Sequence, residues 1–112
     1  MTSGTPSQPS TRPATRATIL LGVRDHAHHT SLRVKLMQRA KRAKLAGATV
    51  FAAHEGYGVS RRIHQNHALS GDSPLALVII DAPERINAFL LENADLLADV
   101  VIVMDDVDIV EF

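Results

Sequence analysis

Residues 75–97 read "LALVIIDAPERINAFLLENADLL", an apolar run that changes at Asp81 into a segment with helical spacing. The run at 75–80 is short and apolar throughout, which indicates a strand near the centre of a sheet. Asp81 with Glu84 three residues later matches a capping box, and Pro83 is tolerated in a first helical turn. One broad apolar face follows, made by Ile86, Phe89, Leu90, Ala94 and Leu97. A strand followed by a helix is therefore predicted.

A second strand–helix pair precedes this one. Residues 17–23, "ATILLGV", have the composition of a buried strand, and Thr30 or Ser31 can cap a helix that begins at Leu32. Helix formers continue to Ala46, and Gly47 stands where a left-handed residue would end the helix. The apolar arc of this helix consists of Leu32, Leu36, Ala40 and Ala43.

Two further strands complete the predicted order. "ATVFAA" at 48–53 is one, and the start of the final segment "VVIVMDDVDIVEF" is the other. An acidic turn is expected at Asp105–Asp106, followed by a short alternating piece that places Val107, Ile109 and Glu111 on one face. The order β-α-β-β-α-β is typical of an α+β, ferredoxin-like sandwich, an antiparallel four-stranded sheet with two helices on one face.

The predicted domain is small and its core is thin. Residues 1–16 are rich in Ser, Thr and Pro and are expected to form a disordered tail, which leaves a domain at 17–112. The whole chain contains three Phe, one Tyr and no Trp. A sheet with helices on one side leaves its other face and its edges uncovered, so self-association, and specifically a homotrimer that packs sheet faces inward, is predicted.

Composition excludes several classes of function. Cysteine is absent, which removes disulfides, iron–sulfur clusters and thiolate metal sites. No segment has the ~20 apolar residues that span a bilayer, and the N-terminal stretch lacks the apolar run of a secretory signal, so a cytoplasmic protein is expected. No residues combine as nucleophile, base and oxyanion donors, so an enzyme is not predicted. The sequence names no cofactor.

The charges are unevenly distributed although they sum to zero. Residues 1–71 contain eleven of the twelve Lys and Arg, and residues 72–112 contain ten of the twelve acids. Six of the basic residues lie between Arg33 and Lys44, where Lys35, Arg39 and Arg42 share one side of the predicted helix. The basic residues are otherwise scattered and no aromatic platform accompanies them, which favours a solvated helix over a nucleic-acid site.

Residues 54–67, "HEGYGVSRRIHQNH", contain the candidate ligand site. Gly56 and Gly58 can adopt positive φ and expose backbone N–H groups to an anion. Arg61 and Arg62 offer forked donors suited to phosphate or carboxylate. The remaining candidates are Tyr57, which could stack on a base, with Ser60 and His64. A purely structural loop is the alternative.

A histidine cluster offers a different site. His26, His28 and His29 follow the first predicted strand, and imidazole is a common ligand of transition metals. A metal site here would resemble the CutA divalent-cation-tolerance group, which shares the fold and forms trimers. Solvated loop histidines that bind nothing are the alternative.

Several of these segments together resemble a known family. "HEGYGVSRRIH" is similar to the Gly-aromatic-Gly…Ile-His loop of the PII-like group called domain of unknown function 190. "LSGDSPLALVIIDAPERINAFL" and the acidic "DDVDIV" near the end also resemble its pattern, so the similarity extends from about Ala17 to Phe112. Two features depart from the pattern: Gln65 stands where Thr is usual, and "LADVV" lacks the second glycine-rich loop of PII proteins.

The resemblance implies a ligand-sensing regulator rather than an enzyme. PII-like proteins are ferredoxin-like homotrimers that place small effectors, often adenine nucleotides, in clefts between subunits. Their long loop after the second strand docks on a partner, frequently a membrane transport protein. The equivalent loop here would be the segment from Glu55 to Gly71, with Gly56, Tyr57, Gly58, Ser60, Arg61, Arg62 and His64 contacting the ligand.

Overall fold

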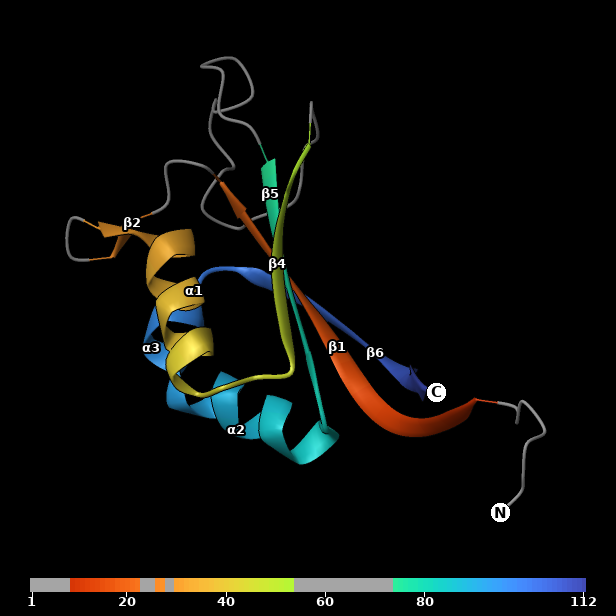
Figure 1. Cartoon of the computed structure of the whole chain (residues 1–112). Helices are drawn as coiled ribbons and strands as arrows, with labels where there is room; N and C mark the ends of the chain where they lie inside the picture. Colours follow the sequence, from red (N-terminus) through yellow and green to blue (C-terminus); the bar gives the residue numbers. More distant parts are fainter. Residues whose placement is uncertain (1–8, 23–25, 28–29, 54–73) are drawn as a thin grey trace.

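The computed structural model describes residues 9–22, 26–27, 30–53 and 74–112, whose elements are arranged as Figure 1 shows. The main strands are β1 (Ser10–Gly22), β4 (Gly47–Ala52), β5 (Pro74–Asp81) and β6 (Val101–Glu111). The helices are α1 (Leu32–Arg42), α2 (Pro83–Glu92) and α3 (Ala94–Leu97). A two-residue pair, β2 (His26–Ala27) with β3 (Thr30–Ser31), precedes α1.

The main sheet has four strands in the order β4-β5-β1-β6, and every neighbouring pair is antiparallel. Strand β1 is central and pairs with β5 from Thr15↔Asp81 to Gly22↔Pro74. The crossovers through α1 and through α2–α3 each skip one strand, so the predicted ferredoxin-like β-α-β-β-α-β arrangement is confirmed.

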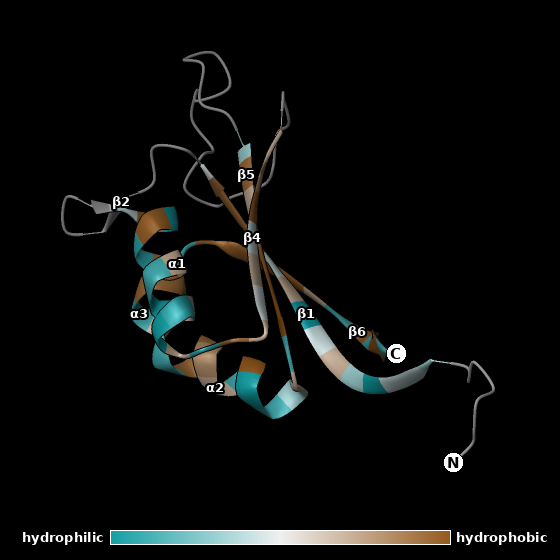
Figure 2. Cartoon of the chain, in the orientation of Figure 1, coloured by the Kyte–Doolittle hydropathy of each residue, from teal (hydrophilic) through white to brown (hydrophobic). Residues whose placement is uncertain are grey.

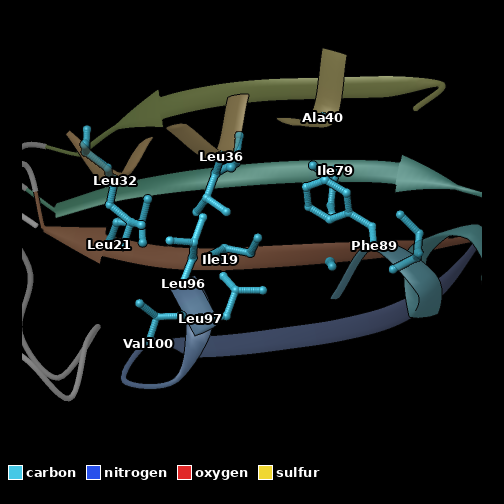
Figure 3. Packing of buried hydrophobic residues seen from close by; sticks show 14 residues of the cluster. Ile19, Leu21, Leu32, Leu36, Ala40, Ile79, Phe89, Leu96, Leu97 and Val100 are labelled. Carbon is cyan, nitrogen blue, oxygen red and sulfur yellow. The ribbon is translucent and has the colours of Figure 1, made fainter. Parts of the chain in front are cut away.

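All three helices lie on one face of the sheet, and the hydrophobic core fills the space between the helices and the sheet (Figure 3). Alternate residues of the central strands point to the helices: Ile19, Leu77 and Ile79 are completely buried. They pack with Leu36 of α1 and Phe89 of α2. The predicted apolar face of α1 is confirmed, because Leu32, Leu36 and Ala40 are its buried residues.

Strand β1 begins at Ser10, seven residues before the expected boundary of the folded domain. Residues 10–14 pair with 107–111 of β6, beyond the last residue of β5, and form a two-stranded ribbon (Figure 1). The acidic turn expected at Asp105–Asp106 is wrong, since β6 continues through it to Glu111. Backbone pairing with β1 overrides the low strand preference of aspartate, and Asp105 also binds Arg16 at 2.6 Å.

The helix ends differ from the expected caps. Ser31 precedes α1 as predicted, but its side chain makes no capping hydrogen bond. Lys44 (φ 57°), not Gly47, is the left-handed residue after α1, and Gly47 begins β4. The capping box of Asp81 and Glu84 is also wrong: Ala82 is the N-cap of α2, with Pro83 following it in the first turn.

Instead, Asp81 joins three segments at the end of β5. Its carboxylate accepts hydrogen bonds from the backbone N–H of Ala82 (2.6 Å), from that of Ala46 (2.9 Å) and from Arg85 Nε (2.9 Å). Arg85 Nη2 in turn donates to the carbonyls of Ala43 (2.7 Å) and Lys44 (2.9 Å). Those carbonyls belong to the end of α1, so the Asp81–Arg85 pair fixes the turn into β4 against the start of α2.

Replacing Asp81 with alanine should destabilise the fold. The change leaves the Ala46 N–H and Arg85 Nε without their acceptor, and the expected loss is about 2 kcal/mol of unfolding free energy. Chemical unfolding followed by circular dichroism measures it. Glu92→Ala, at an exposed acid in the last turn of α2, is the control and should stay within about 0.5 kcal/mol of the wild type. If Asp81→Ala were as stable as the wild type, the role of Asp81 in joining these segments would be contradicted.

The pKa of Asp81 determines one part of how the stability of the fold depends on pH. Burial alone would raise its pKa, but hydrogen bonds from Ala82, Arg85 and Ala46 outweigh burial and lower it. A lowered folded-state pKa means that the stabilisation is complete above the unfolded value of about 3.9 and is lost as the pH falls through the folded value. The stability difference between wild type and Asp81→Asn should therefore shrink below about pH 4.

Urea titrations between neutral and strongly acidic pH measure this difference. The pKa of Asp105 is also lowered, chiefly by its hydrogen bond from Arg16, but Asp105 is present in both proteins and its effect cancels. A difference that persisted unchanged into strong acid would show that the Asp81 carboxylate is not the titrating group.

Candidate functional site

The base of the candidate ligand loop lies at one end of the sheet. Strand β4 ends at Ala52, opposite Leu75 at the start of β5, and the Ala53 N–H donates to the Pro74 carbonyl at 3.0 Å. The chain therefore leaves and re-enters the sheet on adjacent strands. Residues Gly56, Tyr57, Gly58, Ser60, Arg61, Arg62 and His64 lie outside the described residues, so their contacts stay a prediction.

The same end of the sheet brings other segments to the loop base. Gly22, the last residue of β1, pairs with Pro74, and Val101, the first residue of β6, pairs with Leu20. The histidine segment follows β1 at this end. His28 and His29 lie outside the described residues, and for His26 only the backbone is described. Among the described residues no group of three His, Asp or Glu could hold a metal ion, so the metal prediction stays untested at the histidines.

The helix-free face of the sheet is open, and near the base of the loop it is mainly apolar. Register and burial alternation place Leu20 of β1, Val78 of β5 and Val103 of β6 on this face. Phe51 of β4, which pairs with Ala76, lies there too, and its side chain is 57% exposed; that of Val103 is 52% exposed. Figure 2, which colours the backbone by residue, shows apolar residues in β5 and toward the end of β1. This face is the one predicted to pack against other subunits.

A second concave surface lies between α1 and α2 on the opposite side of the sheet. This groove, of about 300 Å³, is lined by Arg39, Arg42, Ala43, Phe89, Glu92 and Asn93. Asn93 is buried and donates to the Phe89 carbonyl at 2.8 Å, which fixes its side-chain oxygen toward α1. Arg39 Nη1 donates to that oxygen at 2.7 Å and lies 4.0 Å from Asp95. Helical spacing predicted that Lys35, Arg39 and Arg42 share one side of α1, but not that Asn93 would orient Arg39.

Comparison with known proteins identifies the family. The family model DUF190, described as "Uncharacterized ACR", matches residues 14–109. The chain belongs to this family. A UPF0166 protein of Aquifex aeolicus (strain VF5) is 44% identical over 59 residues, which cover 51% of this chain and 56% of that protein. The match thus spans little more than half of the relative's length.

Solved structures of PII-like proteins share the DUF190 fold. A structure of CPII from Thiomonas intermedia K12, bound to ADP, AMP and acetate, superposes with a TM-score of 0.64 at 17% identity, covering 89% of this chain and 91% of that one. CPII bound to ADP and bicarbonate gives 0.62 at 17% identity, with the same coverage. A PII-like signalling protein of Thermus thermophilus gives 0.55 at 20% identity, covering 89% and 90%.

The predicted membership of the domain of unknown function 190 family is confirmed by the family match, and the predicted fold is confirmed by the structural matches. None of the described helices is long and apolar enough to cross a membrane. The loop motif and the strand–helix pattern after it were sufficient to find the family. The sequence did not reveal the length of β1 or the ribbon that it forms with β6. The polar composition of residues 10–16 is also typical of a disordered tail, so composition alone could not distinguish the two.

Proposed function

We propose that the chain is a homotrimeric regulatory protein that binds a small anionic effector, such as an adenine nucleotide, in clefts between subunits. Effector binding orders the loop from Glu55 to Gly71 and changes the affinity of this loop for a partner, such as a membrane transport protein. The protein acts by binding and not by catalysis. The observation on which this proposal depends is the open apolar face of the sheet, which begins beside the base of that loop.

The open face supports self-association. Val78 and Ile80 of the central strand β5 stay partly exposed in the single subunit, and Val103 and Phe51 are more exposed still. An apolar surface of this kind across several strands is typical of a protein interface. Three sheets packed face to face would cover it and would place each loop base near a neighbouring subunit.

The ligand class rests on the loop and on the solved relatives. CPII, which has the same fold, has been solved with ADP, AMP, acetate and bicarbonate, all of which carry negative charge. In this chain Gly56 and Gly58 with Arg61 and Arg62 supply donors for such groups. The junction from Ala98 to Val100 has no glycine. The second glycine-rich loop of PII proteins is therefore missing, and we assign the contacts with phosphate to the arginines of the loop after β4.

Val103→Asp should dissociate the trimer. The side chain is 52% exposed in the subunit, so the subunit tolerates a carboxylate, whereas an interface would bury that carboxylate without a partner. The dissociation constant should rise about a hundredfold or more, as measured by sedimentation equilibrium. Leu91→Asp, at a 78% exposed position on α2, is the matched control and should leave the assembly intact. Unaltered assembly in both variants would contradict an interface on the open face.

Effector binding should depend on the loop arginines. Isothermal titration with ADP, AMP, ATP, bicarbonate and acetate should give heat for at least one ligand. Arg61→Ala/Arg62→Ala should weaken binding by about tenfold or more, because charge-assisted hydrogen bonds to the anion are lost.

Arg33→Ala/Lys41→Ala removes the same charge from exposed positions of α1 and should bind like the wild type. The absence of heat with every ligand would overturn the effector proposal. Equal weakening in the two double variants would show a general charge effect instead of a site in the loop.

A further inference from the structure

The ribbon projects from the body of the domain without support from a third described strand. Its five residue pairs, 10–14 with 107–111, extend about 17 Å beyond the end of β5. A two-stranded ribbon buries little surface of its own. Contact with another surface would therefore stabilise it.

The two faces of the ribbon differ in how their charges are compensated. On one face Arg12 binds Glu111 at 2.9 Å, and at the base of the ribbon Arg16 binds Asp105 at 2.6 Å. On the other face Asp106 lies opposite Thr15, and Asp108 lies opposite Pro13. Within the described residues, neither the Asp106 nor the Asp108 side chain forms an ion pair or a hydrogen bond.

These two carboxylates line a cleft between the ribbon and the start of α2. The cleft has a volume of about 350 Å³, and its lining consists of Pro13, Ala14, Pro83, Asp106, Val107 and Asp108. Arg85, the cation of α2, is already bound to Asp81 and to the carbonyls of Ala43 and Lys44. The lining combines apolar walls with two uncompensated acids, which suits the aliphatic stem and charged end of a long basic side chain.

A surface of opposite charge lies on α1 of the same chain. Lys35, Arg39 and Arg42 form a basic stripe about 10 Å long on one side of this helix. Arg39 contacts Asn93 and approaches Asp95, while Lys35 and Arg42 form no ion pair with any described residue. Asp106 and Asp108 lie about 7 Å apart along β6, within the length of the stripe.

The two surfaces lie apart in one subunit, as Figure 1 shows: α1 covers the sheet, and the ribbon extends away from it. We propose that the ribbon cleft of one subunit receives the basic stripe of α1 from a second copy of the chain. This contact joins two different patches, and such heterologous contacts close into rings around a symmetry axis. The inference rests on the self-association proposed above, and it adds the contact that orients neighbouring subunits.

Neutralising the cleft should weaken the assembly. Asp106→Asn/Asp108→Asn keeps the shape of both side chains and should raise the dissociation constant of the trimer about tenfold in sedimentation equilibrium at low salt. Glu84→Lys changes the net charge by the same amount at an exposed residue that does not line the cleft, and should assemble like the wild type. The effect should diminish in 1 M NaCl, where the screening length falls to about 3 Å.

A charge swap decides between a specific contact and a loss of folding. Asp106→Lys/Asp108→Lys should weaken assembly further, and adding Lys35→Glu/Arg42→Glu to the same chain should restore it. Circular dichroism checks that each variant is folded. Wild-type assembly in Asp106→Asn/Asp108→Asn, or no recovery in the swapped chain, would overturn the inference. If Val103→Asp still dissociates the trimer in that case, the proposed function is unaffected; a monomeric wild type would overturn both.

Discussion

The helices cover only one face of the sheet, and the rest of the account depends on this fact. The helices bury Ile19, Leu77 and Ile79, while Leu20 and Val78 on the same strands remain partly exposed. With few aromatic residues, the layer between sheet and helices supplies a limited hydrophobic core for a domain of this size. In the proposed trimer, burial of the second face by other copies would add hydrophobic stabilisation to that of the single subunit. The proposed trimer, its clefts and its ligand site follow from this constraint.

Sequence patterns predicted the fold where local and tertiary preferences agree. The apolar strand at 75–80 and the helix after it are central in the structure, and the order of elements determined the sheet. The helix caps were less predictable. The carboxylate of Asp81 can cap a helix, but it can equally bind groups that are distant in the sequence. Its use for Ala46 and Arg85 depends on how α1 ends, which local spacing does not specify.

The N-terminal half of β1 and the continuation of β6 were missed for a related reason. Residues such as Pro13 and Asp108 have little strand preference, and their pairing is visible only when the two strands are brought together. The candidate ligand residues were found from a motif instead, and Gly56 to His64 remain predictions. The described part adds where the two ends of that loop attach, at the end of β4 and the start of β5, beside the end of β1.

The native mass of the unmodified protein tests the central claim most directly. Light scattering coupled to size-exclusion chromatography, at micromolar concentration and low salt, should give three times the subunit mass of 12.1 kDa. That result is the one expected if other copies cover the apolar sheet face in solution. A well-folded species with the mass of one subunit would contradict the account, because its open face would then be exposed and no cleft between subunits would exist.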